Sequence, residues 1–129
     1  VDCDVVQADG GTRTAAVTGS SVALACAVRR LQADNQLGKN ILRDFLAAVS
    51  VGIVEGEPVL DLCYLEDAAA DVDMNIVMTG AGQFVEIQGT AESAPFDFGQ
   101  MEQMLDLARR GIAHLILKQK EALGTDACP

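Results

Sequence analysis

Four short apolar runs, each bounded by a turn signal, lie between two long segments with helical spacing. Short runs that are rich in β-branched residues are typical of strands, and tight turns between consecutive strands favour antiparallel pairing. We expect strands over residues 48–54, 59–65, 74–79 and 84–88. Helices on either side of this block predict an α+β fold in which the helices pack on a mainly antiparallel sheet.

The two helical segments differ in their surfaces. In residues 12–32, apolar side chains recur at helical spacing among many small ones, namely Val17, Leu24, Val28 and Leu31. The second segment begins with Asp97 and Gln100 at the spacing of a capping box, and Gly124 is expected to end it before a loose tail over residues 125–129. Its apolar stripe consists of Met101, Met104, Leu105, Ala108, Ile112, Leu115 and Ile116.

The first five residues, Val1 to Val5, alternate apolar and acidic side chains. This period of two predicts a strand with one buried face. A chain rarely begins inside such a strand, and the first residue is not methionine. We therefore expect the sequence to be the C-terminal portion of a longer protein.

Composition excludes several classes of protein. Half of the residues are hydrophobic, which is enough for a packed core and argues against a disordered chain. Cys3, Cys26, Cys63 and Cys128 are few, far apart and without a CxxC pair, which disfavours a disulfide scaffold, a zinc site and a redox motif. No run approaches the length of a membrane span, so we expect a soluble, intracellular protein with reduced thiols. His114 has no partner at metal-ligand spacing and is interpreted as structural or surface.

The charge balance is unusual for a protein that handles nucleic acid. Nine Lys and Arg stand against nineteen Asp and Glu, for a net charge of −10, whereas a free-standing nucleic-acid binder normally has the opposite sign. Residues 1–44 hold five basic and five acidic side chains, so the whole excess lies in residues 45–129. If this protein acts on a polyanion, the basic surface that binds the substrate must come from outside this sequence, or from a few well-placed residues and a metal.

The segment Gly10-Gly11-Thr12-Arg13-Thr14 stands where a predicted strand meets a helix. Glycines let the backbone approach a ligand closely, and the first helical turn has unpaired N–H groups and a partial positive charge. The Thr12 hydroxyl and the Arg13 guanidinium add donors that suit phosphate. The alternative is a plain glycine turn with a capping threonine and a solvated arginine, which is the commoner structure.

A second candidate is the pair Asp67 and Asp73, which belong to four carboxylates within residues 66–73. Carboxylates that converge raise one another's pKa or recruit a hard cation such as Mg²⁺ or Mn²⁺. A solvated acidic loop is the commoner alternative.

Taken together, the sequence blocks resemble those of the ribonuclease PH family. The resemblance begins with the block from Asp2 to Thr14 and spans nearly the whole chain up to the last helix. The matching blocks after it are 47–54, 65–67, 73–79, 86–92 and 95–96. These blocks, in this order, are specific to the family.

The resemblance implies a phosphorolytic 3′→5′ exoribonuclease that trims the 3′ ends of tRNA precursors and acts in cytoplasmic tRNA and rRNA processing. Such enzymes use inorganic phosphate, release nucleoside 5′-diphosphates and form hexameric rings built as trimers of dimers. Residues 1–44 would be the end of a ribosomal-protein-S5-like first domain, and residues 45–129 the family's C-terminal α+β domain. The family's N-terminal half, which supplies further arginines, is absent from this sequence.

The resemblance also assigns roles to particular residues. Gly11, Thr12 and Arg13 match the phosphate-binding triplet, and Asp67 and Asp73 match the paired aspartates of metal binding or proton transfer. Two other functions stay open: a metal-dependent hydrolytic phosphodiesterase, and a catalytically inert ring subunit of an exosome-like assembly.

Overall fold

The computed structural model describes residues 1–124, and the four strands lie between two long helices as predicted, with an additional short helix among the strands and no strand before the first helix. The elements are α1 (Thr12–Ala33), β1 (Leu46–Val54), β2 (Glu57–Leu60), α2 (Tyr64–Ala69), β3 (Val72–Thr79), β4 (Phe84–Ala91) and α3 (Phe98–Leu123). The predicted loose tail, residues 125–129, lies outside the described part of the chain.

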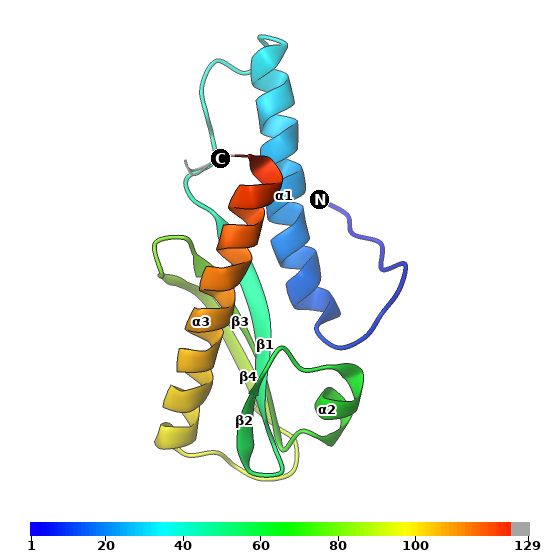
Figure 1. Cartoon of the computed structure of the whole chain (residues 1–129), viewed down its shortest axis with the longest axis vertical. Coiled ribbons are helices and arrows are strands. Elements are labelled where there is room, and N and C mark those ends of the chain that lie inside the picture. Colours follow the sequence, from blue (N-terminus) through cyan, green and yellow to red (C-terminus); the bar gives the residue numbers. More distant parts are fainter. Residues whose placement is uncertain (125–129) are drawn as a thin grey trace.

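The strands form one sheet in the order β2-β1-β3-β4, with every neighbouring pair antiparallel. This confirms the predicted α+β fold. Figure 1 shows α3 lying over the sheet, α1 running beside it, and α2 at the lower right. The β2 strand pairs only with Val51–Val54 of β1, so the first half of that edge of β1 is left without a strand.

Helix α1 occupies this open edge of β1. The Thr18 hydroxyl accepts a hydrogen bond from the Ala48 N–H at 3.0 Å and donates to the Ala48 carbonyl at 3.2 Å. From α3, the buried Gln119 side chain donates through Nε2 to the carbonyls of Leu46 at 2.8 Å and Thr18 at 3.0 Å. These bonds satisfy backbone groups that a further strand would otherwise satisfy, and they fix α1 against the sheet.

The core lies between α3 and one face of the sheet. Met104, Ala108, Ile112 and Ile116 of the predicted stripe are buried there. The ends of α3 also agree with the prediction, because Asp97 and Gln100 form a reciprocal capping box and Gly124 adopts a left-handed conformation.

The predicted apolar face of α1 is only partly buried. Val28 is buried, but Leu24 and Leu31 are exposed. The reason is visible in Figure 1, where the second half of α1 extends past the end of the sheet. Ala25 is completely buried instead, because a small side chain lets the helix approach its neighbours closely.

Two predictions about strands are wrong. Val1 to Val5 form no strand, because a strand needs a neighbour and these exposed residues have none within residues 1–124. The second run does not extend to Leu65: β2 ends at Leu60, where Asp61 turns the chain with a φ of 61°. The chain then enters α2, whose first turn is stabilised by a reciprocal capping box between Cys63 and Glu66.

No helix within residues 1–124 is long and apolar enough to cross a bilayer. Cys3, Cys26 and Cys63 are free thiols, and Cys128 lies outside the described residues.

Candidate phosphate and carboxylate site

The sheet face opposite α3 carries the candidate site. Successive side chains of a strand point to opposite faces, and Met74 and Ile76 of β3 belong to the core beneath α3. The intervening residues of β3 therefore point to the other face, where the antiparallel register aligns them with β1 and β4 in three rows. The rows are Gly52–Asp73–Thr90, Ser50–Asn75–Gln88 and Ala48–Val77–Glu86.

The two glycines before α1 bring the start of this helix against that face. A side chain at Gly10 would place Cβ only 1.9 Å from the Leu62 carbonyl oxygen, so nothing larger than glycine fits. Gly11 has a φ of 66°, a left-handed conformation that favours glycine, and its Cβ position lies 3.4 Å from Ser50 Oγ. The start of α1 therefore lies beside the middle row of the site face.

The first turn of α1 offers unpaired N–H groups. The first helical hydrogen bond runs from the Ala15 N–H to the Gly11 carbonyl, so the N–H groups of residues 12–14 precede it. Thr12 is exposed, and no side chain caps the helix. Thr14 is buried instead and donates its hydroxyl to the Gly11 carbonyl at 2.9 Å, a role that the sequence did not predict.

Arg13 forms an ion pair with Glu86, so it is not the solvated arginine of the plain glycine turn. Its Nη2 donates to both carboxylate oxygens of Glu86, at 2.7 Å and 2.9 Å. The two side chains are 50% and 38% exposed, so water screens this ion pair only in part. No sequence motif assigns a role to Glu86, which begins the matching block 86–92 and stands in a predicted strand.

The acidic segment divides into structural and unpaired carboxylates. Glu66 accepts a hydrogen bond from the Cys63 N–H and so caps α2. Asp71 accepts a short hydrogen bond from the Ser93 hydroxyl. The side chain of Asp67, in the first turn of α2, makes no hydrogen bond or ion pair with any residue from 1 to 124, whereas its backbone N–H donates to the Cys63 carbonyl. Asp73 lies half-buried on β3.

Asp67 and Asp73 lie close enough to influence each other. Burial raises the pKa of the Asp73 carboxyl above its ordinary value, and the negative charges of Asp67 and Glu92 raise it further, while a hydrogen bond from the Met74 N–H opposes them. Asp67 and Glu92 therefore both lie within electrostatic range of Asp73.

The aspartate pair alone supplies too few ligands for a hard cation. No group of three or more His, Cys, Asp or Glu within residues 1–124 has the geometry of a metal site. Mg²⁺ is nevertheless commonly held by one or two carboxylates together with the phosphate oxygens of a substrate. Two coupled carboxylate groups and a bound phosphate meet this requirement, so the donor set fits Mg²⁺ or Mn²⁺ as part of a complex with substrate.

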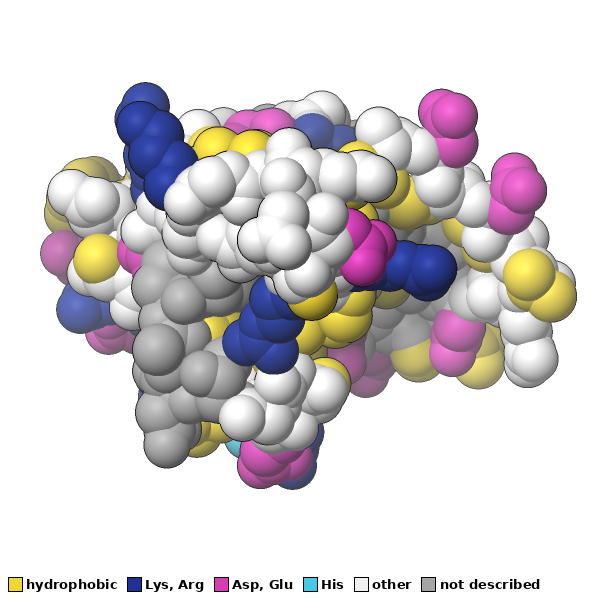
Figure 2. Space-filling model, turned by 90° about the horizontal axis from the view of Figure 1, so that it is seen from above, with side chains coloured by type: hydrophobic (Ala, Val, Ile, Leu, Met, Phe, Trp, Pro, Cys, Tyr) yellow, Lys and Arg dark blue, Asp and Glu magenta, His cyan; other side chains and the backbone are white. Residues whose placement is uncertain are grey.

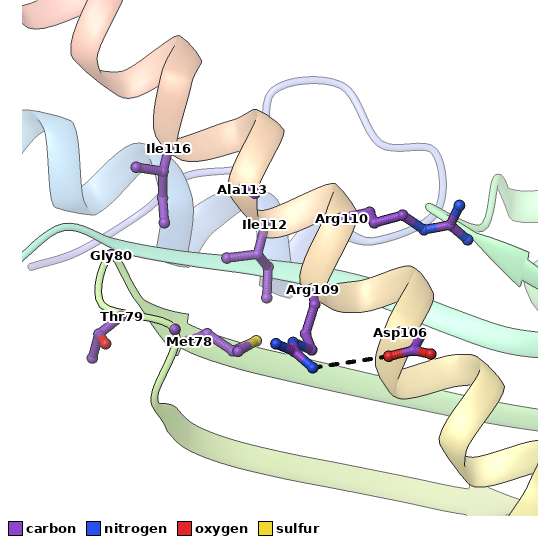
Figure 3. Close-up of a pocket in the computed structure, with 10 residues that line it drawn as sticks. Met78, Thr79, Gly80, Asp106, Arg109, Arg110, Ile112, Ala113 and Ile116 are labelled. Carbon is purple, nitrogen blue, oxygen red and sulfur yellow. Dashed lines mark ion pairs between the residues drawn. The ribbon is translucent and has the colours of Figure 1, made fainter.

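Two cavities flank α3. The first, of about 700 Å³, lies between α3 and the end of β3 (Figure 3), where Arg109 pairs with Asp106 at 4.0 Å and Arg110 points away from the ion pair. None of the predicted site residues lines it. The second, of about 690 Å³, reaches Gly10, Gly11 and Thr14 from the side of α3, and the exposed His114 lines it.

Basic side chains do not gather into a continuous patch on the end of the molecule seen in Figure 2. Lys and Arg side chains there are separated by acidic, apolar and other polar groups. This pattern agrees with the net charge of −10. Arg13 stands in the first turn of α1, and Arg110 of α3 lines the second cavity together with Gly10 and Gly11.

Comparison with known proteins establishes the family. The model of the 3′ exoribonuclease family, domain 2, matches residues 44–111, slightly more than half of the chain. The chain belongs to this family, as the sequence blocks had indicated.

Two relatives named Ribonuclease PH match almost the entire chain. The protein from Solibacter usitatus (strain Ellin6076) is 58% identical over 123 residues, which are 95% of this chain and 52% of that protein. The protein from Syntrophomonas wolfei subsp. wolfei is 56% identical over 124 residues, which are 96% of this chain and 52% of the relative. The chain thus spans about half the length of these relatives.

Solved structures share the fold. The crystal structure of rice (Oryza sativa) Rrp46 aligns with a TM-score of 0.75 and 16% identity, over 94% of this chain and 52% of that one. A chain of an archaeal exosome core aligns with a TM-score of 0.54 and 22% identity, over 60% and 31% of the two chains.

Proposed function

We propose that the chain is the C-terminal portion of a phosphorolytic 3′→5′ exoribonuclease that trims the 3′ ends of tRNA precursors. The observation that supports this most strongly is the placement of two kinds of group on one sheet face. The start of α1, with Arg13, lies beside the middle row, Asp73 lies in the adjacent row, and the charge of Asp67 in α2 acts on Asp73. Such a face can hold an oxyanion beside a scissile phosphodiester.

In the proposed reaction, the N–H groups of the first α1 turn and the Arg13 guanidinium hold inorganic phosphate. A phosphate oxygen attacks the phosphorus of the terminal phosphodiester in line with the departing 3′ oxygen. The new P–O bond forms as the old one breaks, and the released nucleotide leaves as a nucleoside 5′-diphosphate. Arg13 stabilises the negative charge that develops on the equatorial oxygens.

The departing 3′ oxygen needs a proton. Asp73 is the better donor of the two aspartates, because burial and the neighbouring carboxylates favour its protonated form. In their ionised forms Asp67 and Asp73 would instead hold Mg²⁺ or Mn²⁺ beside the substrate, and that cation would supply charge neutralisation at the phosphate oxygens. Through that cation the aspartates would thus neutralise charge at one end of the substrate, as Arg13 does at the other.

We further propose the organisation of the complete protein. Residues 1–44 would be the end of the S5-like first domain and residues 45–129 the C-terminal domain. An N-terminal half would supply more basic residues, and the cytoplasmic enzyme would assemble as a hexameric ring. The fold shared with a chain of an archaeal exosome core supports ring assembly, and the half-length match to the relatives supports a missing half.

Two rival functions make different predictions. A metal-dependent hydrolase would use water and release nucleoside monophosphates. An inert ring subunit would release nothing and would have no need of Gly11, Thr12 and Arg13 together with the aspartate pair. The retention of both groups on one face favours the phosphorolytic enzyme over the inert subunit.

Product analysis tests the proposal. The complete protein that contains this chain is expected to shorten an RNA with a tRNA-like 3′ end only when inorganic phosphate is present, and chromatography should identify nucleoside 5′-diphosphates. Nucleoside monophosphates formed without phosphate would establish hydrolysis instead. No product from either reaction, by a folded protein with Mg²⁺ and Mn²⁺ supplied in turn, would support the inert subunit.

A further inference from the structure

Glu86 holds Arg13 by one nitrogen only. Both of its carboxylate oxygens accept hydrogen bonds from Nη2, at 2.7 Å and 2.9 Å. The guanidinium has five N–H donors, and those of Nε and Nη1 make no hydrogen bond with any residue from 1 to 124. Arg13 therefore keeps donors for an anion while Glu86 holds it in place.

The shape of the guanidinium fixes where that anion must lie. A guanidinium binds an oxyanion along either of two edges, one formed by Nε and Nη2 and the other by Nη1 and Nη2. Nη2 is a corner of both edges. Because Nη2 already serves Glu86, an oxyanion is held at the other corner of an edge, by Nε or Nη1, and there it lies beside the carboxylate of Glu86.

Two anions placed this close repel each other unless a proton lies between them. Inorganic phosphate carries one or two protons near neutral pH and can donate a hydrogen bond through its P–OH group. Sulfate is also a dianion but carries no proton at this pH, so it meets the same repulsion without a compensating hydrogen bond. The Glu86 carboxylate keeps its hydrogen bonds to Arg13, but its remaining lone pairs would face sulfate without a donor, and this costs binding free energy.

We propose that Glu86 is a specificity-determining residue, which accepts a hydrogen bond from the P–OH of inorganic phosphate bound at Arg13 and so selects phosphate over sulfate. This inference rests on the proposed function, since it concerns the same anion site. It adds a residue from β4 to a site whose other anion ligands come from the start of α1.

The test compares two anions in the complete enzyme. The KM for inorganic phosphate and the inhibition constant of sulfate, as a competitor of phosphate, are measured in the wild type and in Glu86→Gln. The ratio of the sulfate constant to the phosphate KM is expected to fall about tenfold in Glu86→Gln, because a hydrogen bond to a charged acceptor is lost for phosphate alone. Removal of the Glu86 charge relieves electrostatic repulsion for both anions, so the loss of the hydrogen bond is what changes for phosphate alone.

Two further variants separate the role of Glu86 from general effects. Glu102→Gln makes the same change of charge on the exposed surface of α3 and should leave the ratio unchanged. Glu86→Asp keeps a carboxylate and should keep a higher ratio than Glu86→Gln. Circular dichroism establishes that each variant is folded.

The possible failures are distinguishable. A wild-type enzyme that releases nucleoside 5′-diphosphates, combined with an unchanged ratio in folded Glu86→Gln, would overturn the role of Glu86 and leave the proposed function standing. A wild type that releases no diphosphates would overturn the proposed function, and the role of Glu86 with it.

Discussion

Replacing Arg13 by alanine in the complete enzyme is expected to lower kcat/KM for inorganic phosphate by about a hundredfold to a thousandfold. The loss of one preorganised donor to a developing oxyanion has effects of this order, and Arg13 also contributes a full charge. Most of the loss should appear as a higher phosphate KM, since the guanidinium contacts phosphate in the ground state as well. Initial rates of diphosphate release over a range of phosphate concentrations measure both constants.

Arg30→Ala is the matched control for this experiment. Arg30 is an exposed residue in the last turn of the same helix, so its removal changes the net charge equally at the end remote from the site. We expect Arg30→Ala to retain the phosphate dependence of the wild type. An Arg13→Ala enzyme whose phosphate KM equals that of the wild type would remove Arg13 from the anion site.

The Asp73→Asn variant is expected to lose turnover by about a hundredfold or more while it still binds RNA. An amide of the same shape neither donates a carboxyl proton nor offers the charge that a cation needs, and general acid catalysis alone accounts for a loss of this size. Turnover is measured under single-turnover conditions, and RNA affinity by filter binding. Asp106→Asn, on the exposed surface of α3, is the matched control. Full turnover by Asp73→Asn would exclude both roles of this residue.

The same substitution is expected to stabilise the fold at neutral pH. The pKa of Asp73 is raised in the folded chain above the ordinary value of 3.8, so the folded chain holds this proton more tightly than the unfolded chain. Ionised Asp73 therefore destabilises the fold as pH rises above about 4, and below the ordinary value the cost is absent. Thermal unfolding at pH 7 should occur at a higher temperature for Asp73→Asn, and the difference should shrink toward pH 4.

Much of the fold could be predicted because its signals are local. The capping box of Asp97 and Gln100, the apolar stripe of α3 and the glycine turns each act within a few residues. The predicted strand at Val1–Val5 is wrong because strand formation depends on a partner strand, which sequence periodicity does not provide. The short helix α2 was missed because its stabilisation comes from the side chain of Glu66, in a segment where four carboxylates obscured the single cap.

The candidate site likewise combines residues that local sequence signals indicate with residues that only the fold brings to it. The glycines before α1 and the acidic segment attracted attention because unusual residue types gather there in the sequence. Glu86 is 73 residues from Arg13, and only the register of β3 with β4 shows that it lies on the same sheet face. Glu92 influences Asp73 for the same reason, since β4 returns the chain to the beginning of β3.

A crystal structure with phosphate and Mn²⁺ tests the central claim most directly. Crystals of the complete protein, grown at saturating phosphate, should show an oxyanion within hydrogen-bond distance of the N–H groups of residues 12–14 and of the Arg13 guanidinium. An anomalous manganese signal should lie between Asp67 and Asp73. Density for neither ion, with both carboxylates turned away from the start of α1, would contradict the account.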